Sequence, residues 1–323
     1  MSVTILDVAA LAGYSKSTVS RVFTNPDGVP ERTRERVLEA AHILNYTPNA
    51  IARAMARKKT ENLAFIISGE QYPAVFSPFY SPVLEGILQT SRKYGYSMLV
   101  MPDSDLPVIN VGQPFLRKQM DGVIAAGNID VQFLLELRSR NIPTVLVNNS
   151  EVSGDFFSVA TDHYQGSVKA VEHLVNCGYR KIGLVAGKFS PKIAMNRYNA
   201  FIDTMNRHQI PIDFRYVQSI DATVASAIRC VSTMLKLQDP PEALFCTNDI
   251  IAVGAIKAAN KLRRKVPDDL AVIGYDGSQM CAMMEPEITS IYVDTFKMGK
   301  AATKLLISVI NGDKIPQKKI LIP

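Results

Sequence analysis

The sequence contains no tryptophan and few of the residues that commonly bind metals or form disulfides. It has four cysteines and four histidines among 323 residues, without a CxxC pair or an HxxxH pair. We therefore expect reduced cysteines and no metal site. No apolar run approaches the ~20 residues that a membrane-spanning helix needs. The first residues show no basic segment followed by an apolar one, so we expect no secretory signal and a cytoplasmic location.

Sequence motifs of the common enzyme classes are also missing. No G-x-G-x-x-G follows an expected strand, and the chain has no G-x-x-x-x-G-K-[ST], no G-x-S-x-G and no HExxH. These patterns mark dinucleotide binding, phosphate binding, nucleophilic hydrolysis and zinc-dependent hydrolysis. The sequence therefore predicts a protein without catalytic residues or a cofactor. An α/β enzyme of an unfamiliar kind stays as an alternative.

The composition is that of a globular protein with a local excess of positive charge. Hydrophobic residues make up 47% of the chain and charged residues 20%, which suffices for one or two cores. The net charge is +6, and residues 1–60 hold nine Lys/Arg against five Asp/Glu. A basic terminal segment of this kind favours an anionic partner, with a solvated basic face as the alternative.

Residues 4–45 predict three short helices. Thr4 and Asp7 have the spacing of a capping box ahead of the first helix, Gly13 ends it, and Ser15 can cap the second. The third helix follows Pro30. Two helices joined by a tight glycine-containing turn and followed by a supporting helix are typical of a helix-turn-helix module.

The pattern changes after residue 60. Residues 50–59 are good helix formers, but so short an isolated helix is marginal in water, and we interpret residues 48–60 as a linker. Beyond it, apolar runs alternate with amphipathic stretches, which predicts helix-covered parallel sheets in two lobes with a cleft between them. The expected strands are 63–67, 97–101, 122–126, 144–147, 181–186, 242–246 and 271–275. The expected helices are 82–94, 164–177, 191–208, 223–237, 250–262 and 295–310.

Several motifs, in order along the chain, resemble those of one known family. Residues 4–22 read TILDVAALAGYSKSTVSRV, residues 33–37 TRERV and residues 45–49 NYTPN. Further on come DHYQG at 162–166, TND at 247–249, VPDDL at 266–270 and IGYD at 273–276. In these motifs the chain is similar to the lactose/galactose repressor (LacI/GalR) family of bacterial transcription regulators, over nearly its whole length.

The resemblance implies a fold and a domain organisation. The fold would be α/β, with an N-terminal helix-turn-helix module followed by a two-lobed sensor domain of the periplasmic-binding-protein type with parallel sheets. The expected boundaries are 1–47 for the DNA-binding domain, 48–60 for the hinge helix or linker, and 61–323 for the effector-binding and dimerisation domain. Within the last, lobe 1 takes about 61–160 with part of 292–323, and lobe 2 about 161–291.

The resemblance also implies which residues contact DNA. In the family, the second helix reads bases in the major groove, which makes Lys16, Ser17 and Arg21 the expected base contacts. Paired hinge helices enter the minor groove, where Met55 replaces the family's usual Leu as the expected wedge. Away from DNA, the alternative for this segment is a flexible charged linker. The other expected contacts, most of them to phosphates, are Thr4, Ser15, Thr18, Asn25, Asn49, Ala52 and Arg57.

The sensor domain of the family binds a small molecule between its lobes. Its amide, carboxylate and guanidinium groups suit a neutral ligand with many hydroxyls, such as a sugar or sugar derivative, although purines and phosphoprotein partners occur in the family. The polar residues could instead end strands or cap helices, and the aromatic pair could belong to the core. The family more often has Asp at Asn148, and a polar residue where Gly277 stands. By position, the expected effector contacts are Phe79, Tyr80, Asn148, Arg197, Asn248 and Asp276.

Together, these features predict a sequence-specific DNA-binding transcription regulator of the repressor type, whose operator affinity a small-molecule effector controls. The expected partners are palindromic double-stranded operator DNA and a second copy of the chain. A dimer is expected because paired DNA-binding modules match a palindromic operator, and no leucine heptad of the kind that forms tetramers follows the last strand. No membrane partner is expected. The alternative is a sugar-binding protein of the solute-uptake type without a role on DNA, which leaves residues 1–60 unexplained.

Overall fold

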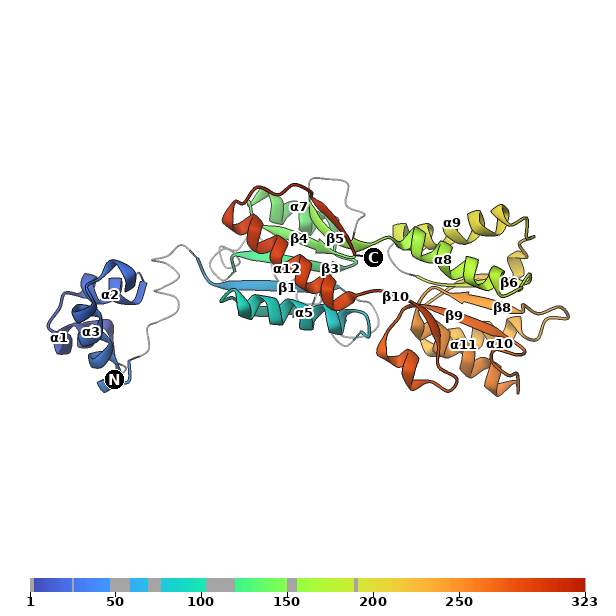
Figure 1. Ribbon diagram of the computed structural model, residues 1–323, viewed down its shortest axis with the longest axis horizontal. Helices are drawn as coiled ribbons and strands as arrows, with labels where there is room; N and C mark the ends of the chain where they lie inside the picture. Colours follow the sequence, from blue (N-terminus) through green and yellow to red (C-terminus); the bar gives the residue numbers. More distant parts are fainter. Residues whose placement is uncertain are drawn as a thin grey trace.

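The computed structural model describes residues 3–24, 26–46, 59–68, 77–102, 120–149, 156–188 and 191–322. A small helical domain and two α/β lobes follow one another along the long axis of the molecule (Figure 1). Among the described helices, none is both long and apolar enough to span a membrane. Most of the expected linker lies outside the described residues, as do the expected DNA contacts Asn25, Asn49, Ala52, Met55 and Arg57.

The helical domain packs around a small apolar core. It comprises α1 (Ile5–Ala12), α2 (Lys16–Thr24), the 3-10 turn η1 (Pro26–Gly28) and α3 (Glu31–Ile43). Each α-helix buries one valine completely, namely Val8, Val19 and Val37. Gly13 has a φ of 73° and its N–H donates to the carbonyl of Ala9 at 3.0 Å, so a left-handed residue ends α1. The short turn this allows sets α2 directly after α1.

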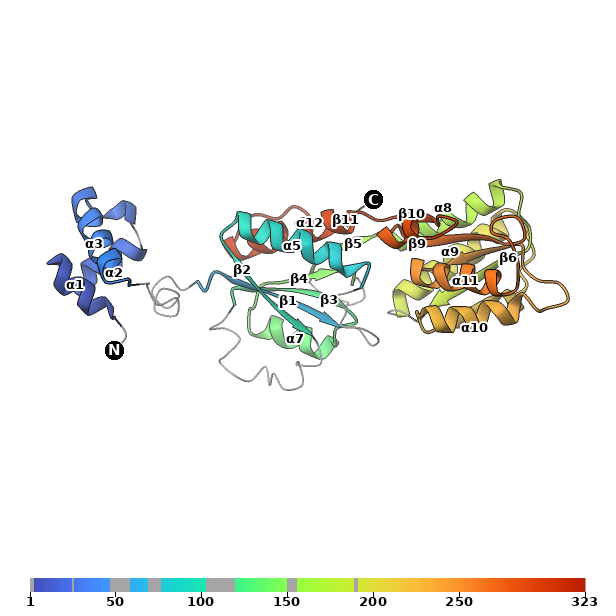
Figure 2. The same ribbon diagram turned by 90° about the horizontal axis from the view of Figure 1, so that it is seen from below.

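Lobe 1 is built on a six-stranded parallel sheet with the strand order β11-β5-β4-β3-β1-β2. Helices α5 (Tyr80–Lys93) and α12 (Thr295–Asn311) cover one face, and α7 (Val131–Ser139) covers the other (Figure 2). Alternate residues of β1 supply both cores, since Phe65 joins the α5 and α12 side and Ile66 joins the α7 side. The strands are β1 (Asn62–Ser68), β2 (Ser97–Pro102), β3 (Gly122–Gly127), β4 (Thr144–Val147), β5 (Phe157–Thr161) and β11 (Lys319–Ile322).

Lobe 2 is built on a five-stranded parallel sheet with the order β10-β9-β8-β6-β7. Helices α8 (His163–Asn176) and α9 (Pro191–Arg207) lie on one side, and α10 (Val224–Met234) and α11 (Asp249–Lys261) on the other (Figure 1). Two 3-10 turns, η4 (Phe214–Tyr216) and η5 (Gln279–Met283), complete the lobe. The strands are β6 (Ile182–Gly187), β7 (Val217–Ile220), β8 (Ala243–Cys246), β9 (Ala271–Asp276) and β10 (Thr289–Tyr292).

The chain passes from lobe 1 to lobe 2 between β5 and α8, and it returns between β10 and α12. In open parallel sheets, ligands bind beyond the carboxyl ends of the strands. Asn148 follows β4 of the first sheet, Asn248 follows β8 of the second, and Asp276 ends β9. The three residues therefore lie at strand ends of this kind, two in lobe 2 and one in lobe 1.

The predicted fold class is confirmed, including the helix-turn-helix module and the two parallel sheets. All seven predicted strands and all six predicted helices of the lobes are present, with bounds that differ by at most three residues. The prediction missed β5, β7, β10 and β11, together with helix α7.

Candidate DNA-binding surface and effector site

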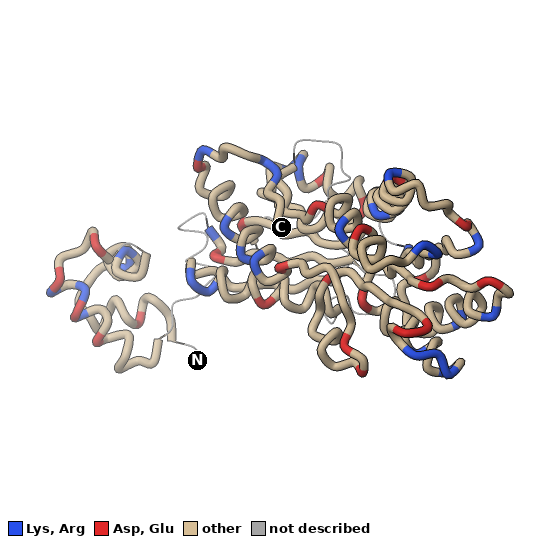
Figure 3. Tube along the Cα trace, turned by 45° about the vertical axis from the view of Figure 1, so that its right-hand side comes forward, with Lys and Arg blue, Asp and Glu red and all other residues tan. Residues whose placement is uncertain are grey.

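Helix α2 presents a polar and positively charged face to solvent. Lys16, Ser17 and Arg21 are exposed, whereas Val19 and Val22 on the opposite side are 0% and 3% exposed. The helix contains no acidic residue, and Figure 3 shows the basic positions of this domain in blue. The three side chains predicted to read bases are therefore all accessible to a second molecule.

The hydroxyl groups predicted to contact phosphates lie at helix N-termini. Ser15 Oγ accepts a hydrogen bond from Thr18 N at 3.1 Å, and it also lies 2.7 Å from Ser17 Oγ. At the start of α1, Thr4 N and Oγ1 both donate to Asp7 Oδ2 at 2.8 Å. These two donors, the backbone N–H first, hold the pKa of Asp7 below its usual value. Both helices thus begin at residues fixed by side-chain hydrogen bonds.

Arg197 is the central buried cation of lobe 2. It extends from α9, and 3% of its surface is exposed. Its Nη1 donates to the carbonyl of Thr247, and its Nη2 lies 3.2 Å from His163 Nδ1. The guanidinium carbon lies 3.9 Å from the centroid of the Tyr275 ring, and Asp276 Oδ1 is 3.7 Å from Nη2. The buried guanidinium is thus surrounded by a carbonyl oxygen, a ring nitrogen, an aromatic face and a carboxyl group.

Two neighbours of Arg197, His163 and Asp276, have strongly shifted pKa values. Burial, and then the positive charge of Arg197, lowers the pKa of His163 to about 2, so this imidazole is neutral. Since a guanidinium only donates, His163 Nδ1 accepts and Nε2 carries the proton. Burial raises the pKa of Asp276 to about 8, although Arg197 opposes the shift. The site thus combines one permanent cation with a carboxyl group that is largely protonated at neutral pH.

The lobe 1 side of the site consists of Phe79, Tyr80 and Asn148. The two aromatic rings are 5.0 Å apart at 80°, and Phe79 belongs to the main core while Tyr80 is partly exposed. Burial raises the pKa of Tyr80 to about 12, although a hydrogen bond from the Asn148 side chain acts to lower it. The charges of Asp276 and Arg197 also act on this hydroxyl. Residues of both lobes therefore meet in one electrostatic environment.

Two predicted residues have backbone or capping roles as well. Asn148 has a φ of 53°, a left-handed conformation that Asn tolerates better than most residues. Asn248 Oδ1 accepts from Ile251 N at 2.9 Å and so caps α11, which leaves its amide N–H₂ as the group that could face a ligand. The capping alternative for Asn248 is thus present in the structure. It does not use all of the side chain's hydrogen-bonding groups.

The turn after Asp276 requires glycine. Gly277 has a φ of 63°, and a Cβ there would lie 2.7 Å from Tyr292 Cα. The buried carboxylate of Asp249 holds the same turn, because it accepts from Ser278 N at 2.7 Å and from Ser290 Oγ at 2.6 Å. Close packing against β10 therefore explains why a polar side chain is missing at Gly277.

The buried polar atoms at this site that lack a hydrogen-bond partner among the described residues include Asn148 Oδ1, an acceptor, and His163 Nε2, a donor by the assignment above. The hydroxyl of Tyr275 is another. Sequence reasoning did not assign roles to His163, Tyr275, Thr247 or Asp249. Each directly adjoins a predicted residue or a quoted motif, which is the signal that could have identified them.

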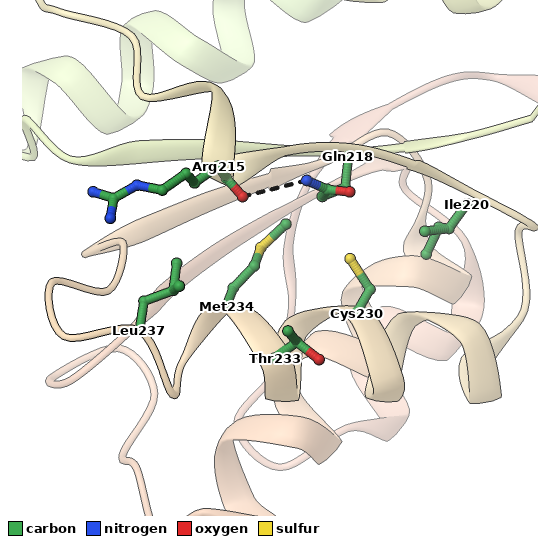
Figure 4. Close-up of a pocket in the computed structure, with 7 residues that line it drawn as sticks. All are labelled: Arg215, Gln218, Ile220, Cys230, Thr233, Met234 and Leu237. Atoms are coloured by element: carbon green, nitrogen blue, oxygen red, sulfur yellow. Dashed lines mark hydrogen bonds between the residues drawn. The ribbon is translucent and has the colours of Figure 1, made fainter.

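A separate pocket of about 300 Å³ lies between β7 and α10 (Figure 4). Gln218 in its wall donates to the carbonyl of Arg215 at 3.3 Å. None of the six predicted effector residues lines this pocket. The described residues also contain no group of three or more His, Cys, Asp or Glu side chains that could hold a metal ion. The lining residues are Arg215, Gln218, Ile220, Cys230, Thr233, Met234 and Leu237.

Comparison with known proteins gives two family matches. Residues 4–49 match the family of bacterial regulatory proteins of the lacI type, and residues 171–323 match the periplasmic binding protein-like domain. Catabolite control protein A of Priestia megaterium is 31% identical over 100% of this chain and 97% of its own. The transcriptional repressor PurR of Actinobacillus pleuropneumoniae is 29% identical over 96% of this chain and 92% of its own.

Two solved structures are similar to this chain over nearly its whole length. The Lac repressor dimer bound to operator and the anti-inducer ONPF has a TM-score of 0.85 and 26% identity, covering 100% of this chain and 97% of that one. The regulator CelR in complex with cellobiose has a TM-score of 0.73 and 26% identity, covering 99% and 97%. The chain therefore belongs to the LacI family of bacterial regulatory proteins, as a DNA-binding transcriptional repressor with a small-molecule-binding domain.

Proposed function

We propose that this repressor binds a palindromic operator as a homodimer, with Lys16, Ser17 and Arg21 of α2 reading bases in the major groove. The exposure of all three side chains on one helix supports this assignment. An α-helix fits the ~12 Å major groove, and an arginine can recognise guanine through two hydrogen bonds. Thr4, Ser15 and Thr18 would bind the flanking phosphates. A protein with this task acts in the cytoplasm.

The proposed division of labour follows the expected boundaries: DNA binding in residues 1–47, a hinge in 48–60 and effector binding in 61–323. The two sheets support the subdivision into lobes, because β1 to β5 and β11 form one sheet and β6 to β10 the other. Strand β11 and helix α12, near the end of the chain, accompany lobe 1. Changes in the cleft could then reach the linker through lobe 1.

We further propose that the effector is a neutral, hydroxyl-rich molecule bound between the lobes and released unchanged. The enclosure of Arg197 beside Tyr275 and Asp276 is the observation on which this rests. Two donors of the guanidinium are already directed at Thr247 and His163, which reduces what it can offer to a phosphate. A ligand hydroxyl can both donate to Asn148 Oδ1 and accept from His163 Nε2. The cellobiose bound by CelR is a molecule of this class.

A thermal-shift screen of sugars, sugar phosphates and nucleobases tests the effector site. We expect a sugar to raise the melting temperature, because ligands that bind only the folded state stabilise it. Arg197→Ala should abolish the shift. The matched control is Arg207→Ala on the same helix, where the arginine pairs with Glu172 at 3.0 Å and is exposed. If Arg197→Ala keeps the full shift, the effector binds elsewhere, and the pocket beside β7 becomes the first candidate.

Selection from a randomised palindromic duplex library tests the DNA surface. The wild-type protein should enrich one palindrome, and Arg21→Ala should weaken binding to it by roughly 30-fold or more, the loss expected for about 2–6 kcal/mol from one bidentate base contact in each half-site. Lys261→Ala, which removes an exposed charge in lobe 2, is the control and should bind normally. Equal losses in the two variants would argue against base reading by Arg21.

A further inference from the structure

Where the chain enters lobe 1, one carboxylate, that of Asp121, binds the two residues Thr60 and Glu61. Asp121, directly before β3, accepts hydrogen bonds at Oδ1 from Thr60 N at 2.7 Å and from Thr60 Oγ1 at 2.9 Å. Its Oδ2 accepts from Glu61 N at 3.0 Å. Its own N–H donates to the carbonyl of Asn62 at 2.8 Å. The residues that precede β1 are thus tied to the start of the neighbouring strand.

A second contact ties the same point to α12. Lys59 Nζ donates to Asn311 Oδ1 at 3.2 Å, and Asn311 is the last residue of that helix. The beginning of β1, the beginning of β3 and the end of α12 therefore meet where residues 48–60 join lobe 1. In Figure 1 this point lies at the end of lobe 1 that faces the helical domain.

The helices that reach this end of lobe 1 start near lobe 2. α12 follows the crossover from β10, and its 17 residues span about 25 Å at 1.5 Å per residue. α5, which starts at the effector-site residue Tyr80, packs tightly along it. A Cβ on Gly299 would lie 2.0 Å from the carbonyl oxygen of Val83, and one on Gly86 would lie 2.2 Å from that of Phe296. Because the backbones of α5 and α12 are in such close contact, the two helices move together. A shift at the end near lobe 2 therefore reaches the end near the linker.

We propose that Asp121 is a positioning residue that fixes where and in which direction the linker leaves lobe 1. A carboxylate suits this role because both oxygens only accept, whereas an amide at the same place turns an N–H₂ group toward one of the three donors. In a dimer, the fixed point at which each linker leaves lobe 1 sets the distance between the two DNA-binding domains. A shift of lobe 1 then moves these domains by a similar amount. The inference rests on the dimeric operator binding proposed above.

The test compares specific and non-specific DNA binding by the full chain. The probes are the palindrome selected by the wild-type protein and a random duplex of equal length at the same salt concentration. Asp121→Asn should weaken binding to the palindrome about tenfold or more, while binding to the random duplex changes less than about twofold, because the phosphate contacts of each domain stay intact. Thr60→Val removes only the hydroxyl donor and should produce a smaller loss in the same direction.

The matched control is Asp130→Ala, which removes a carboxylate that accepts Gln132 N at 2.6 Å in the same lobe, away from the linker. Asp130→Ala should leave the ratio of specific to non-specific affinity unchanged. If Asp121 had a merely structural role, Asp121→Asn would leave this ratio unchanged as well. An unchanged ratio in Asp121→Asn overturns the inference. If that variant melts below the assay temperature, an unchanged ratio in Thr60→Val overturns it instead. Failure of the wild-type protein to prefer any palindrome is a separate result, which rejects the proposed function.

Discussion

At the scale of single residues, Asp276 should make stability depend on pH. Its pKa is raised to about 8 in the folded protein, against about 3.9 in an unfolded chain. Between these values the folded state binds more protons, so the contribution of Asp276 to the free energy of unfolding is lost as pH rises from about 4 through 8. Asp276→Asn, which is uncharged at every pH, should therefore gain stability relative to the wild type between pH 5 and pH 8.5. Urea unfolding at both pH values measures this.

Asp213 provides a comparison, because its pKa is lowered in the folded protein whereas that of Asp276 is raised. Hydrogen bonds from the side chain and backbone of Arg215 lower the pKa of Asp213, so its contribution is present above the unfolded value and lost as pH falls. Asp213→Asn should consequently gain nothing at pH 8.5. A stability difference between Asp276→Asn and the wild type that is the same at pH 5 and pH 8.5 would show that another group causes the wild-type trend.

The pattern of apolar runs predicts which side chains follow a strand, but it does not predict contacts between distant segments. Asn148, Asn248 and Asp276 could be placed at strand ends from the pattern of apolar runs alone. That His163 would lie beside Arg197, 34 positions away, could not, because this depends on how α8 and α9 pack. The left-handed backbone at Asn148 is likewise a property of the folded turn, although it favours the Asn that the sequence shows there.

At the scale of helices, the contact between α5 and α12 should not tolerate a single added methyl group. Gly299→Ala improves intrinsic helix propensity by about 1 kcal/mol. Its Cβ, however, would lie 2.0 Å from the carbonyl oxygen of Val83, a backbone atom that no rotamer change can move. Overpacking of this kind costs about 1–3 kcal/mol or more, so we expect a net loss of stability in thermal unfolding.

Lys304→Ala, on the exposed side of the same helix, is the control and should change the melting temperature little. The opposite ranking, with Gly299→Ala the more stable of the two, would mean that the helices can separate without cost. Because α5 starts at the proposed effector site and α12 ends at the proposed linker, Gly299→Ala should also alter the response of operator binding to effector.

Three of the four strands that the sequence did not predict share a physical cause, whereas the fourth, β5, is an interior strand between β11 and β4. β7, β10 and β11 lie at sheet edges, with β7 and β10 at the two ends of the second sheet and β11 at one end of the first. Edge strands are half exposed, so they lack the continuous apolar runs that mark buried parallel strands. Interior strands such as β3 and β8 are buried along almost their full length and were predicted within one residue.

At the scale of the whole molecule, the sequence predicted two lobes because the apolar runs were too many for one sheet. The two crossovers between the lobes could not be predicted from the pattern of apolar runs, since β5, β10 and β11 were not predicted, and the expected boundaries near 160 and 292 came from the family resemblance. The assignment of β10 and β11 to different sheets depends on pairing between β11 and β5, which are some 160 residues apart. The position of α12 between the crossover from lobe 2 and the end of lobe 1 where β1 begins follows from this pairing.

The uneven charge of the whole chain predicts a steep salt dependence of DNA binding. Residues 1–60 carry nine basic and five acidic residues, whereas the far longer remainder is nearly balanced at 27 and 25. Two such domains that together neutralise about 6–10 phosphates should lose ~10³–10⁵ in affinity between 50 and 200 mM salt. If Arg57, an expected DNA contact, binds a phosphate in each half-site, Arg57→Ala should lower the slope of log affinity against log salt by about 2, and Lys261→Ala should leave it unchanged. A slope near zero for the wild type, measured by fluorescence anisotropy on the selected palindrome, would mean that the basic N-terminal domain does not hold the DNA backbone.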